Sequence, residues 1–244
     1  MFDERSDAYG QMLLAALEGG PRGVAEIVER DDGFISASVM GAELYLAPFR
    51  RWPAHHRQAM RLVRGRVLDV GAGAGRVALH LQERGHDVVS IDISPGAIEV
   101  CRRRGVLDAR LRSLDEVDES LGRFDTIVML GNNFGLFASR AKARRLLRRF
   151  FRLTTARARI VAETRDVYGT SDPAHLAYHE RNRERGRMGG QIRLRVRHRL
   201  AKTPWFDYLM VSRAELEELL EGTGWTLAKT IDSQDTYVAV LEKR

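Results

Sequence analysis

The chain of 244 residues contains one cysteine, six prolines and four lysines. The single thiol, Cys101, cannot close a disulfide within the chain, which excludes a disulfide scaffold and is typical of a reducing compartment. No apolar run approaches the roughly 20 residues that a membrane-spanning helix needs. Residues 1–4 lack the basic and apolar regions of a secretory signal. These absences predict a cytoplasmic protein that is neither secreted nor embedded in a membrane.

Charge is distributed unevenly along the chain. Arginine supplies 36 of the 40 basic residues, and the formal net charge is +7. Residues 140–199 hold 18 Lys and Arg against 5 Asp and Glu, a net of +13, whereas the rest of the chain has a net of −6. Such a segment is explained either by arginines on solvated faces or by an anionic partner, which would be an acidic small molecule or a nucleic acid.

Short apolar strands alternate with helical segments from residue 66 onward. This alternation with short connections predicts an α/β fold, in which a parallel sheet carries helices on both faces. A capping box at Ser212 begins the last helix. The expected strands cover 66–70, 87–91, 110–112, 124–130, 159–163, 225–231 and 236–241, and the expected helices before residue 212 cover 76–84, 94–104 and 140–153.

Two regions depart from this alternation. We expect an N-terminal segment, residues 1–60, with helices at 11–17 and 21–30, followed by the main domain at 61–244. Residues 191–200 alternate arginine with Leu, Val or His, which predicts a half-exposed antiparallel strand. The expected hairpin partner of this strand is the stretch 205–211.

A glycine-rich loop follows the first predicted strand. Residues 67–76 read Val-Leu-Asp-Val-Gly-Ala-Gly-Ala-Gly-Arg, so that a buried strand runs into three alternate glycines and then a helix. Glycines tolerate positive φ and let backbone amides approach a ligand, and a helix start favours a carboxylate or phosphate. Asp92 ends the next strand, where a carboxylate can hold both hydroxyls of an adenosine ribose. A dinucleotide site needs G-x-G-x-x-G, so the early third glycine disfavours nicotinamide and flavin cofactors.

This order of glycines resembles motif I of the class I S-adenosylmethionine-dependent methyltransferases. The likeness continues through the acidic loop 91–94 and the strand 124–130, and it covers residues 60–165 closely. It implies a Rossmann-like, doubly wound sheet of seven strands with the last strand antiparallel. It also implies S-adenosylmethionine as cofactor, S-adenosylhomocysteine as product and methyl transfer as the reaction.

The resemblance assigns cofactor contacts position by position. The glycines would line the methionine and ribose, Asp69 would lie near the methionine amino group, and Asp92 would hold the ribose. Ile93 would pack on the adenine, which Ser113 and Leu114 would border. No acid directly follows the third strand, so the contact to the adenine amino group stays open. The expected cofactor-binding residues are Asp69, Gly71, Ala72, Gly73, Gly75, Arg76, Asp92, Ile93, Ser113, Leu114, Leu130 and Gly131.

The loop after the fourth strand belongs to the acceptor side in this family. Residues 130–135 read Leu-Gly-Asn-Asn-Phe-Gly, without the two prolines that base-modifying amino-methyltransferases carry. The stretch loosely resembles the Gly-Asn-Ser-Phe of glycine N-methyltransferase-like enzymes, where it lies beside a small acceptor. Asn132 and Asn133 would orient an acceptor by paired hydrogen bonds, with a capped turn as the alternative.

Further acceptor-side candidates come from a long insert at about 166–211 and from the N-terminal segment, which would act as a lid. Histidines and a tyrosine at 175–179 would contact the acceptor or act as general base, unless they only pack. The arginines of the alternating strand would receive a carboxylate or phosphate, unless they are only solvated. No metal site is expected. The candidate catalytic residues are Asn132, Asn133, His175, Tyr178 and His179, and the candidate substrate contacts are Phe49, Trp52, Asn132, Asn133, Phe134, Arg195, Arg197, Trp205 and Tyr208.

The sequence therefore predicts a methyltransferase that acts on an O, N or C nucleophile of a small molecule, which the basic segment allows to be anionic, by in-line transfer. Three alternatives stay open. The basic segment permits an RNA methyltransferase, although a nucleic acid is the less favoured partner. The glycine loop alone permits a nicotinamide-dependent oxidoreductase, and a non-catalytic cofactor-binding relative would share every motif.

Overall fold

The computed structural model describes residues 4–38 and 41–244. The first three residues, on which the expectation about a secretory signal partly depends, and residues 39–40 of the N-terminal segment lie outside the described part of the chain. No helix within the described ranges is long and apolar enough to cross a membrane.

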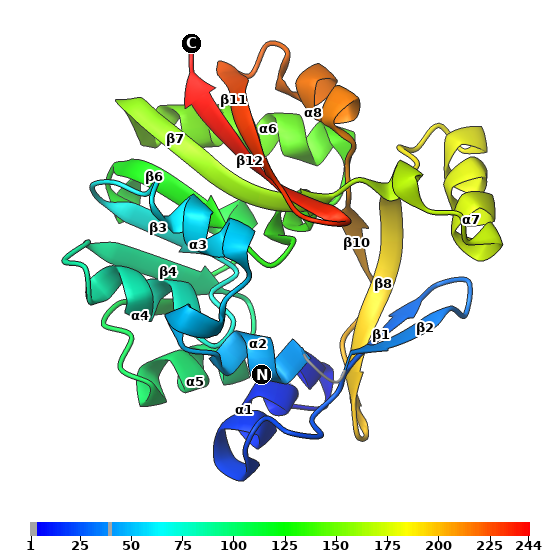
Figure 1. Ribbon diagram of the computed structural model, residues 1–244, viewed down its shortest axis with the longest axis horizontal. Coiled ribbons are helices and arrows are strands. Elements are labelled where there is room, and N and C mark those ends of the chain that lie inside the picture. The colour runs from blue at the N-terminus through cyan, green and yellow to red at the C-terminus, as the bar shows by residue number, and fades with distance from the viewer. Residues whose placement is uncertain (1–3, 39–40) are drawn as a thin grey trace. The chain divides into compact units, whose positions relative to one another are not determined.

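Seven strands form one mixed sheet in the order β11-β12-β7-β6-β3-β4-β5 (Figure 1). The pairs β3–β4, β4–β5 and β6–β7 are parallel, whereas β12 is antiparallel to both β11 and β7. This topology confirms the predicted α/β fold with its last strand antiparallel. The strands are β3 (Val67–Val70), β4 (Val88–Asp92), β5 (Ala109–Leu111), β6 (Phe124–Met129), β7 (Thr154–Arg165), β11 (Trp225–Asp232) and β12 (Thr236–Lys243).

A second, smaller sheet contains β1 (Glu26–Arg30), β2 (Ile35–Ser38), β8 (Gln191–His198) and β10 (Phe206–Leu209) in the order β10-β8-β1-β2. The helix predicted over 21–30 is therefore wrong. The reason is long-range pairing, since β1 is antiparallel to β2 on one side and to β8 on the other. The turn between β1 and β2 needs Gly33, whose φ is +90°.

The alternating arginine strand is confirmed, but it is shorter than predicted. β8 ends at His198, and the chain then turns through Arg199, which has a φ of +52°, and the exposed Leu200. The two-residue strand β9 (Ala201–Lys202) folds back onto β8, and β10 neighbours β8 in the sheet as expected for the hairpin partner.

The chain divides into two compact units. Unit 1 comprises Met1–Pro53, Val67–Val117 and Leu194–Phe206, and unit 2 comprises Ala54–Arg66, Asp118–Arg193 and Asp207–Arg244. The predicted boundary between an N-terminal lid and a main domain near residue 60 stays a prediction.

In unit 1, helix α1 packs directly on α5. Fully buried Met12 and Leu13 from α1 meet Ala97 and Val100 from α5 in one apolar cluster. Ser94 caps α5 by accepting from the Ala97 amide at 3.0 Å, and Pro95 occupies the first turn, where proline's fixed φ suits a helix. The helices of unit 1 are α1 (Ala8–Gly19), α2 (Gly41–Leu46), α4 (Arg76–Gln82) and α5 (Pro95–Arg103), with short 3₁₀ turns at Glu4–Ser6, Phe49–Arg51 and Leu114–Glu116.

In unit 2, helices lie on both faces of the strands β7, β12 and β11 (Figure 1). α3 contacts β11 and β12, while α6 and α8 pack on each other. Fully buried Leu146, Leu147 and Phe150 form the apolar face of α6. The helices of unit 2 are α3 (Ala54–Met60), α6 (Arg140–Arg152), α7 (Pro173–Glu184) and α8 (Arg213–Leu220), with 3₁₀ turns at Glu119–Leu121, Asn133–Phe137 and Val167–Gly169.

Candidate cofactor and acceptor sites

The glycine loop of unit 1 uses the freedom that the sequence predicts for it. Gly71, Gly73 and Gly75 have φ values of +74°, +54° and +74°, a region that other residues rarely adopt. A Cβ on Gly75 would lie 2.6 Å from the Val106 side chain, which shows that packing also demands a glycine there. The loop therefore contains three left-handed residues, none of which carries a side chain.

Asp92 ties the end of β4 to this loop. Its Oδ2 accepts from the Gly73 amide at 2.9 Å, and its Oδ1 accepts from the Ser94 amide at 2.9 Å. Burial raises the pKa of the Asp92 carboxyl, although these backbone hydrogen bonds oppose the shift. Because each carboxylate oxygen has two lone pairs, the acid retains acceptor capacity for the two hydroxyls of a ribose.

Asp69, the one acidic residue of β3, is nearly inaccessible to solvent. Burial raises the pKa of its carboxyl to about 7, while a hydrogen bond from Ser90 and the nearby Arg76 guanidinium act in the opposite direction. When a cation such as an α-amino group binds beside a carboxyl with such a pKa, the cation favours the ionised form and the carboxyl loses its proton. This property suits the role that the sequence predicts for Asp69.

The residues predicted for the adenine side differ in accessibility. The Ile93 side chain is 65% exposed and offers a bare apolar face directly after Asp92. Ser113 instead caps the 3₁₀ turn at Leu114–Glu116, and Leu114 is buried. Of these three, Ile93 has the surface that an adenine ring requires.

Phe49 and Trp52, the substrate contacts predicted in the N-terminal segment, pack within unit 1. The indole of Trp52 is buried, donates to the Ala47 carbonyl at 2.9 Å and carries the Arg76 guanidinium 4.7 Å above its ring. Phe49 stacks on His80 with a centroid distance of 3.7 Å. These contacts give both residues a packing role, and their role toward a substrate stays a prediction.

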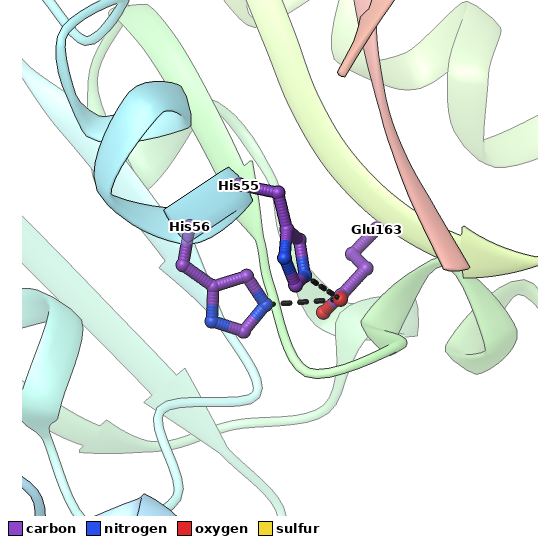
Figure 2. Close-up of side chains that lie close together, drawn as sticks. All are labelled: His55, His56 and Glu163. Carbon is purple, nitrogen blue, oxygen red and sulfur yellow. Dashed lines mark hydrogen bonds and ion pairs between the residues drawn. The ribbon is translucent and has the colours of Figure 1, made fainter. Parts of the chain in front are cut away.

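Unit 2 contains a buried cluster that the sequence analysis missed, formed by His55, His56 and Glu163 (Figure 2). We call it the histidine–glutamate cluster. Both histidine Nε2 atoms lie 2.9 Å from the same oxygen, Glu163 Oε1. The side chains are only 10%, 3% and 5% exposed. The two histidines hold the pKa of the Glu163 carboxyl far below its usual range, although burial acts in the opposite direction.

The second carboxylate oxygen of Glu163 connects this cluster to the loop after β6. Glu163 Oε2 accepts from the amides of Gly131 and Asn132 at 2.6 and 3.0 Å. Asn132 adopts a left-handed conformation with φ of +62°, which Asn tolerates better than most residues. Its side-chain Oδ1 is buried and has no hydrogen-bond partner in the described part of the chain. A buried acceptor of this kind is costly unless a ligand satisfies it.

Tyr208, a predicted acceptor contact, belongs to the same loop cluster. Its hydroxyl donates to the Asn132 carbonyl at 2.5 Å, and its ring occupies the space where Gly135 would carry a side chain. Phe134 is fully buried and packs edge to face on Phe137. The structure thus unites Asn132 and Tyr208, whereas Phe134 serves the core.

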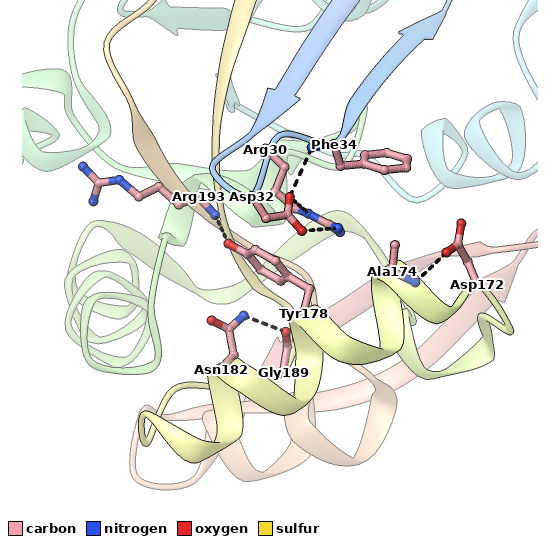
Figure 3. A network of polar contacts seen from close by, with 9 residues as sticks. All are labelled: Arg30, Asp32, Phe34, Asp172, Ala174, Tyr178, Asn182, Gly189 and Arg193. Atoms are coloured by element: carbon pink, nitrogen blue, oxygen red, sulfur yellow. Dashed lines mark hydrogen bonds and ion pairs between the residues drawn. The ribbon is translucent and has the colours of Figure 1, made fainter.

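Two residues of α7, the predicted candidate Tyr178 and Asn182, hold the segment that follows this helix (Figure 3). Tyr178 is buried, and its hydroxyl accepts from the Arg193 amide at 3.1 Å. Asn182 donates to the carbonyls of Gly189 and Gln191 at 3.1 and 2.8 Å. His179 is buried beside Tyr168, whereas His175, the other predicted histidine of this helix, is partly exposed. The contacts of Tyr178 and Asn182 are structural.

The arginines of β8 meet a carboxylate of the protein itself. Arg195 forms two hydrogen bonds with Glu29 at 2.8 and 2.9 Å, and Arg197 forms a third at 3.2 Å. The Arg195 guanidinium also lies 4.4 Å over the Trp205 ring. A role of these arginines toward an anionic substrate remains a prediction.

Part of the remaining positive charge is used inside unit 2. On α6, Arg140 pairs with Glu218 at 3.3 Å, and Arg144 and Arg148 donate to backbone carbonyls that follow α8, at 2.6 and 3.1 Å. These arginines connect α6 to α8 and the turn after it. They therefore have a structural role, whereas the sequence also allowed them to form a surface for a nucleic acid.

The histidine–glutamate cluster is the one group of the described residues whose ligand atoms lie close enough for a metal ion, within 4.8 Å of one another. Two imidazoles and a carboxylate are ligands that Zn²⁺ accepts. The observed separations of 2.9 Å from both histidines to one carboxylate oxygen are also those of hydrogen bonds.

Comparison with known proteins agrees with this geometry. The family model described as "Methyltransferase domain" matches residues 67–156. A magnesium-protoporphyrin O-methyltransferase of Rhodobacter capsulatus is 39% identical over 71 residues, which cover 27% of this chain and 31% of that protein. A glycine/sarcosine N-methyltransferase of Halorhodospira halochloris is 31% identical over 124 residues, 47% of this chain and 45% of that protein. The chain thus spans less than half the length of these curated relatives.

A solved structure resembles the entire chain. A SAM-dependent methyltransferase from Bacteroides fragilis, crystallised with S-adenosyl-L-homocysteine, has a TM-score of 0.82 and 25% identity, covering 100% of this chain and 97% of that one. The fold is Rossmann-like, and the glycine loop and the acid after β4 have the arrangement expected of a site for an adenosyl cofactor. The match to a methyltransferase domain over residues 67–156 and the likeness to this structure support the predicted class I S-adenosylmethionine-dependent methyltransferase family and its cofactor.

Proposed function

We propose that the protein transfers a methyl group from S-adenosylmethionine to an oxygen of a small molecule, with a histidine of the histidine–glutamate cluster as proton acceptor. The observation that carries this proposal is the convergence of His55 and His56 on one oxygen of buried Glu163. The other oxygen of Glu163 holds the amides of the loop after β6, which in this family belongs to the acceptor side.

The chemistry of the acceptor decides whether such a base is needed. Bound S-adenosylmethionine supplies an electrophilic methyl group on a sulfonium. A neutral hydroxyl attacks it well only when its proton is removed, whereas a free amine needs no base. A buried pair of imidazoles next to the acceptor loop therefore favours a hydroxyl, and the likeness to an O-methyltransferase over 71 residues agrees with it.

His55 is the stronger candidate for the base. Its side chain is 10% exposed, against 3% for His56, so it has more room for a proton donor. When Nε2–H donates to Glu163, the neutral ring keeps its lone pair on Nδ1, and that atom accepts the acceptor's proton. Glu163 then stabilises the imidazolium, and it fixes the ring's orientation before reaction.

Asn132 and Tyr208 are proposed to orient the acceptor. The buried Asn132 Oδ1 has an unused acceptor position, which suits a hydroxyl or an N–H of a bound molecule. Tyr208 holds the backbone of Asn132 through its hydroxyl, so it acts as a positioning residue.

The experiment begins with S-adenosylmethionine that carries a radiolabelled methyl group. The protein is incubated with the small-molecule fraction of a cell extract and, in parallel, with total RNA. We expect label in a small molecule, and mass spectrometry of the product then locates the new methyl group on oxygen or nitrogen. Label found only in RNA contradicts the proposal.

Variants test the base once the acceptor is identified. His55→Gln should lower kcat at least about 100-fold, the usual size of a general-base contribution, while the KM for the cofactor stays within about two-fold. Full activity of His55→Gln together with a methylated nitrogen would assign the protein to amine methylation, as in the glycine/sarcosine relative.

A further inference from the structure

A tyrosine hydroxyl lies against the glycine loop of unit 1. A Cβ on Gly73 would be 2.9 Å from the oxygen of Tyr9, so the two groups almost touch. Tyr9 stands on α1, outside the motifs that identify the cofactor loop. Asp92, which accepts from the Gly73 amide, is among the groups that raise the pKa of Tyr9, together with burial, Tyr45 and Glu26.

The placement of Tyr9 is fixed by its neighbours on α1. Asp7 caps this helix by accepting from the Gly10 amide at 3.1 Å, and its other oxygen accepts from the Gly96 amide of α5 at 2.8 Å. A Cβ on Gly96 would be 2.7 Å from the Gly10 Cα, so the two backbones meet without side chains between them. This contact holds α1, and with it Tyr9, against the first turn of α5.

The proton of the Tyr9 hydroxyl is engaged elsewhere. Tyr9 forms a hydrogen bond with Tyr45. A hydroxyl has one proton, and because that of Tyr45 goes to a carboxylate, Tyr9 is the donor. The Tyr45 hydroxyl in turn donates to Glu26, with 3.1 Å to each carboxylate oxygen. The two rings meet edge to face at 5.6 Å. A chain of donors thus runs from Tyr9 to a carboxylate and leaves the lone pairs of the Tyr9 oxygen as acceptors beside Gly73.

An acceptor-only oxygen in acidic surroundings suits a cationic ligand. S-adenosylmethionine differs from S-adenosylhomocysteine by a positive charge on sulfur, which polarises the C–H bonds of its neighbouring carbons. We propose that Tyr9 is a cofactor-positioning residue whose oxygen accepts from these C–H groups, and that Tyr45 and Glu26 hold it in that role. The protein would thereby favour the methyl donor over its product. This inference rests on the proposed function only in assuming that S-adenosylmethionine is the donor.

The test measures binding of both cofactor forms by calorimetry, without any acceptor. C–H···O contacts contribute about 0.5–1 kcal/mol each, so two of them correspond to about 5- to 30-fold in affinity. We expect Tyr9→Phe to weaken S-adenosylmethionine about 10-fold and to change S-adenosylhomocysteine by less than about two-fold. Glu26→Gln should shift the same ratio in the same direction. Tyr168→Phe, which also removes a hydroxyl bonded to a carboxylate, is the matched control and should leave both affinities unchanged.

The outcomes separate the two proposals. Equal losses for both ligands in Tyr9→Phe, or no loss for either, would overturn the role of Tyr9. Wild-type protein that binds neither ligand would overturn the proposed function itself. Thermal unfolding of each variant without ligand shows whether the fold is kept. The conservative variant Tyr45→Phe tests the same chain of hydrogen bonds at its middle residue. We expect it to shift the ratio of the two cofactor affinities less than Tyr9→Phe does.

Discussion

Replacing Glu163 by glutamine should destabilise the fold by an amount that depends on pH. The carboxylate receives two backbone amides on one oxygen and two imidazoles on the other. A glutamine that keeps the amides on its oxygen turns its NH₂ group toward the histidine N–H groups, so that donors face donors. Breaking one side of a buried charged pair costs about 3–5 kcal/mol. We expect a loss of about 3 kcal/mol at pH 7, which lowers Tm by about 6–12 °C for a chain of this size.

The pH dependence follows from the direction of the pKa shift. The pKa of Glu163 is far below its usual value in the folded protein, so the unfolded chain binds the proton more tightly. The carboxylate therefore contributes stability above the ordinary pKa of about 4.3, and this contribution is lost as the pH falls below it, by about 1.4 kcal/mol per pH unit. The difference in Tm between wild type and Glu163→Gln should thus shrink from pH 5 to pH 3.

Thermal unfolding followed by circular dichroism measures both effects. Glu218→Gln is the matched control, because that carboxylate is 57% exposed and pairs with Arg140 at the surface. A surface pair of this kind contributes at most about 1 kcal/mol. Equal Tm values for wild type and Glu163→Gln at pH 7, or a difference that is constant down to pH 3, would refute the description of Glu163 as a buried, hydrogen-bonded carboxylate.

Four further outcomes can be checked. Gly75→Ala should abolish cofactor binding in calorimetry and lower Tm more than Gly105→Ala, because a Cβ clashes with Val106 only at position 75 although both φ values are positive. Since burial places the pKa of Asp69 near 7, binding of S-adenosylhomocysteine at pH 6.5 should release protons, measured in buffers of different ionisation enthalpy, and Asp69→Asn should not release them. Dialysis against a chelator should leave Tm and activity unchanged if the histidine–glutamate cluster works by hydrogen bonding, whereas a stoichiometric metal in elemental analysis would contradict that. Arg195→Gln should lower Tm more than Arg197→Gln, since Arg195 makes two of the three hydrogen bonds to its carboxylate, and a raised substrate KM would instead support the predicted anion site.

The cofactor side could be predicted from the sequence because its determinants are local. A strand, three alternate glycines and a helix occupy ten consecutive residues, and the acid follows at the end of the next strand. The positive φ values of the three glycines and the Asp92–Gly73 hydrogen bond are direct consequences of that pattern. Each requirement involves neighbours in sequence, so a pattern search can find it.

The acceptor side could not be predicted, because its residues meet only through tertiary contacts. His55 and His56 lie on a short helix before the first strand of the main sheet, and Glu163 lies in β7, more than 100 residues later. A pair of adjacent histidines carries no signal by itself, and an acid within an apolar strand is the only hint that a buried partner exists. The same reason explains the wrong helix at 21–30, whose strand depends on pairing with β8.

Recognition of the methyl donor S-adenosylmethionine, as proposed above, involves residues beyond the glycine loop. Tyr9 on α1, the N-cap Asp7 of this helix and Glu26 on β1 precede the glycine loop by 45 residues or more, yet their contacts lead to Gly73 and Gly96. A variant of the motif itself, such as Asp92→Asn, should weaken both forms of the cofactor, since the ribose is common to both. A variant of Tyr9 should weaken only the charged form. The two kinds of variant therefore distinguish a residue that holds the nucleoside from one that contacts the sulfonium. An enzyme that must bind S-adenosylmethionine more tightly than S-adenosylhomocysteine needs a residue of the second kind as well as one of the first.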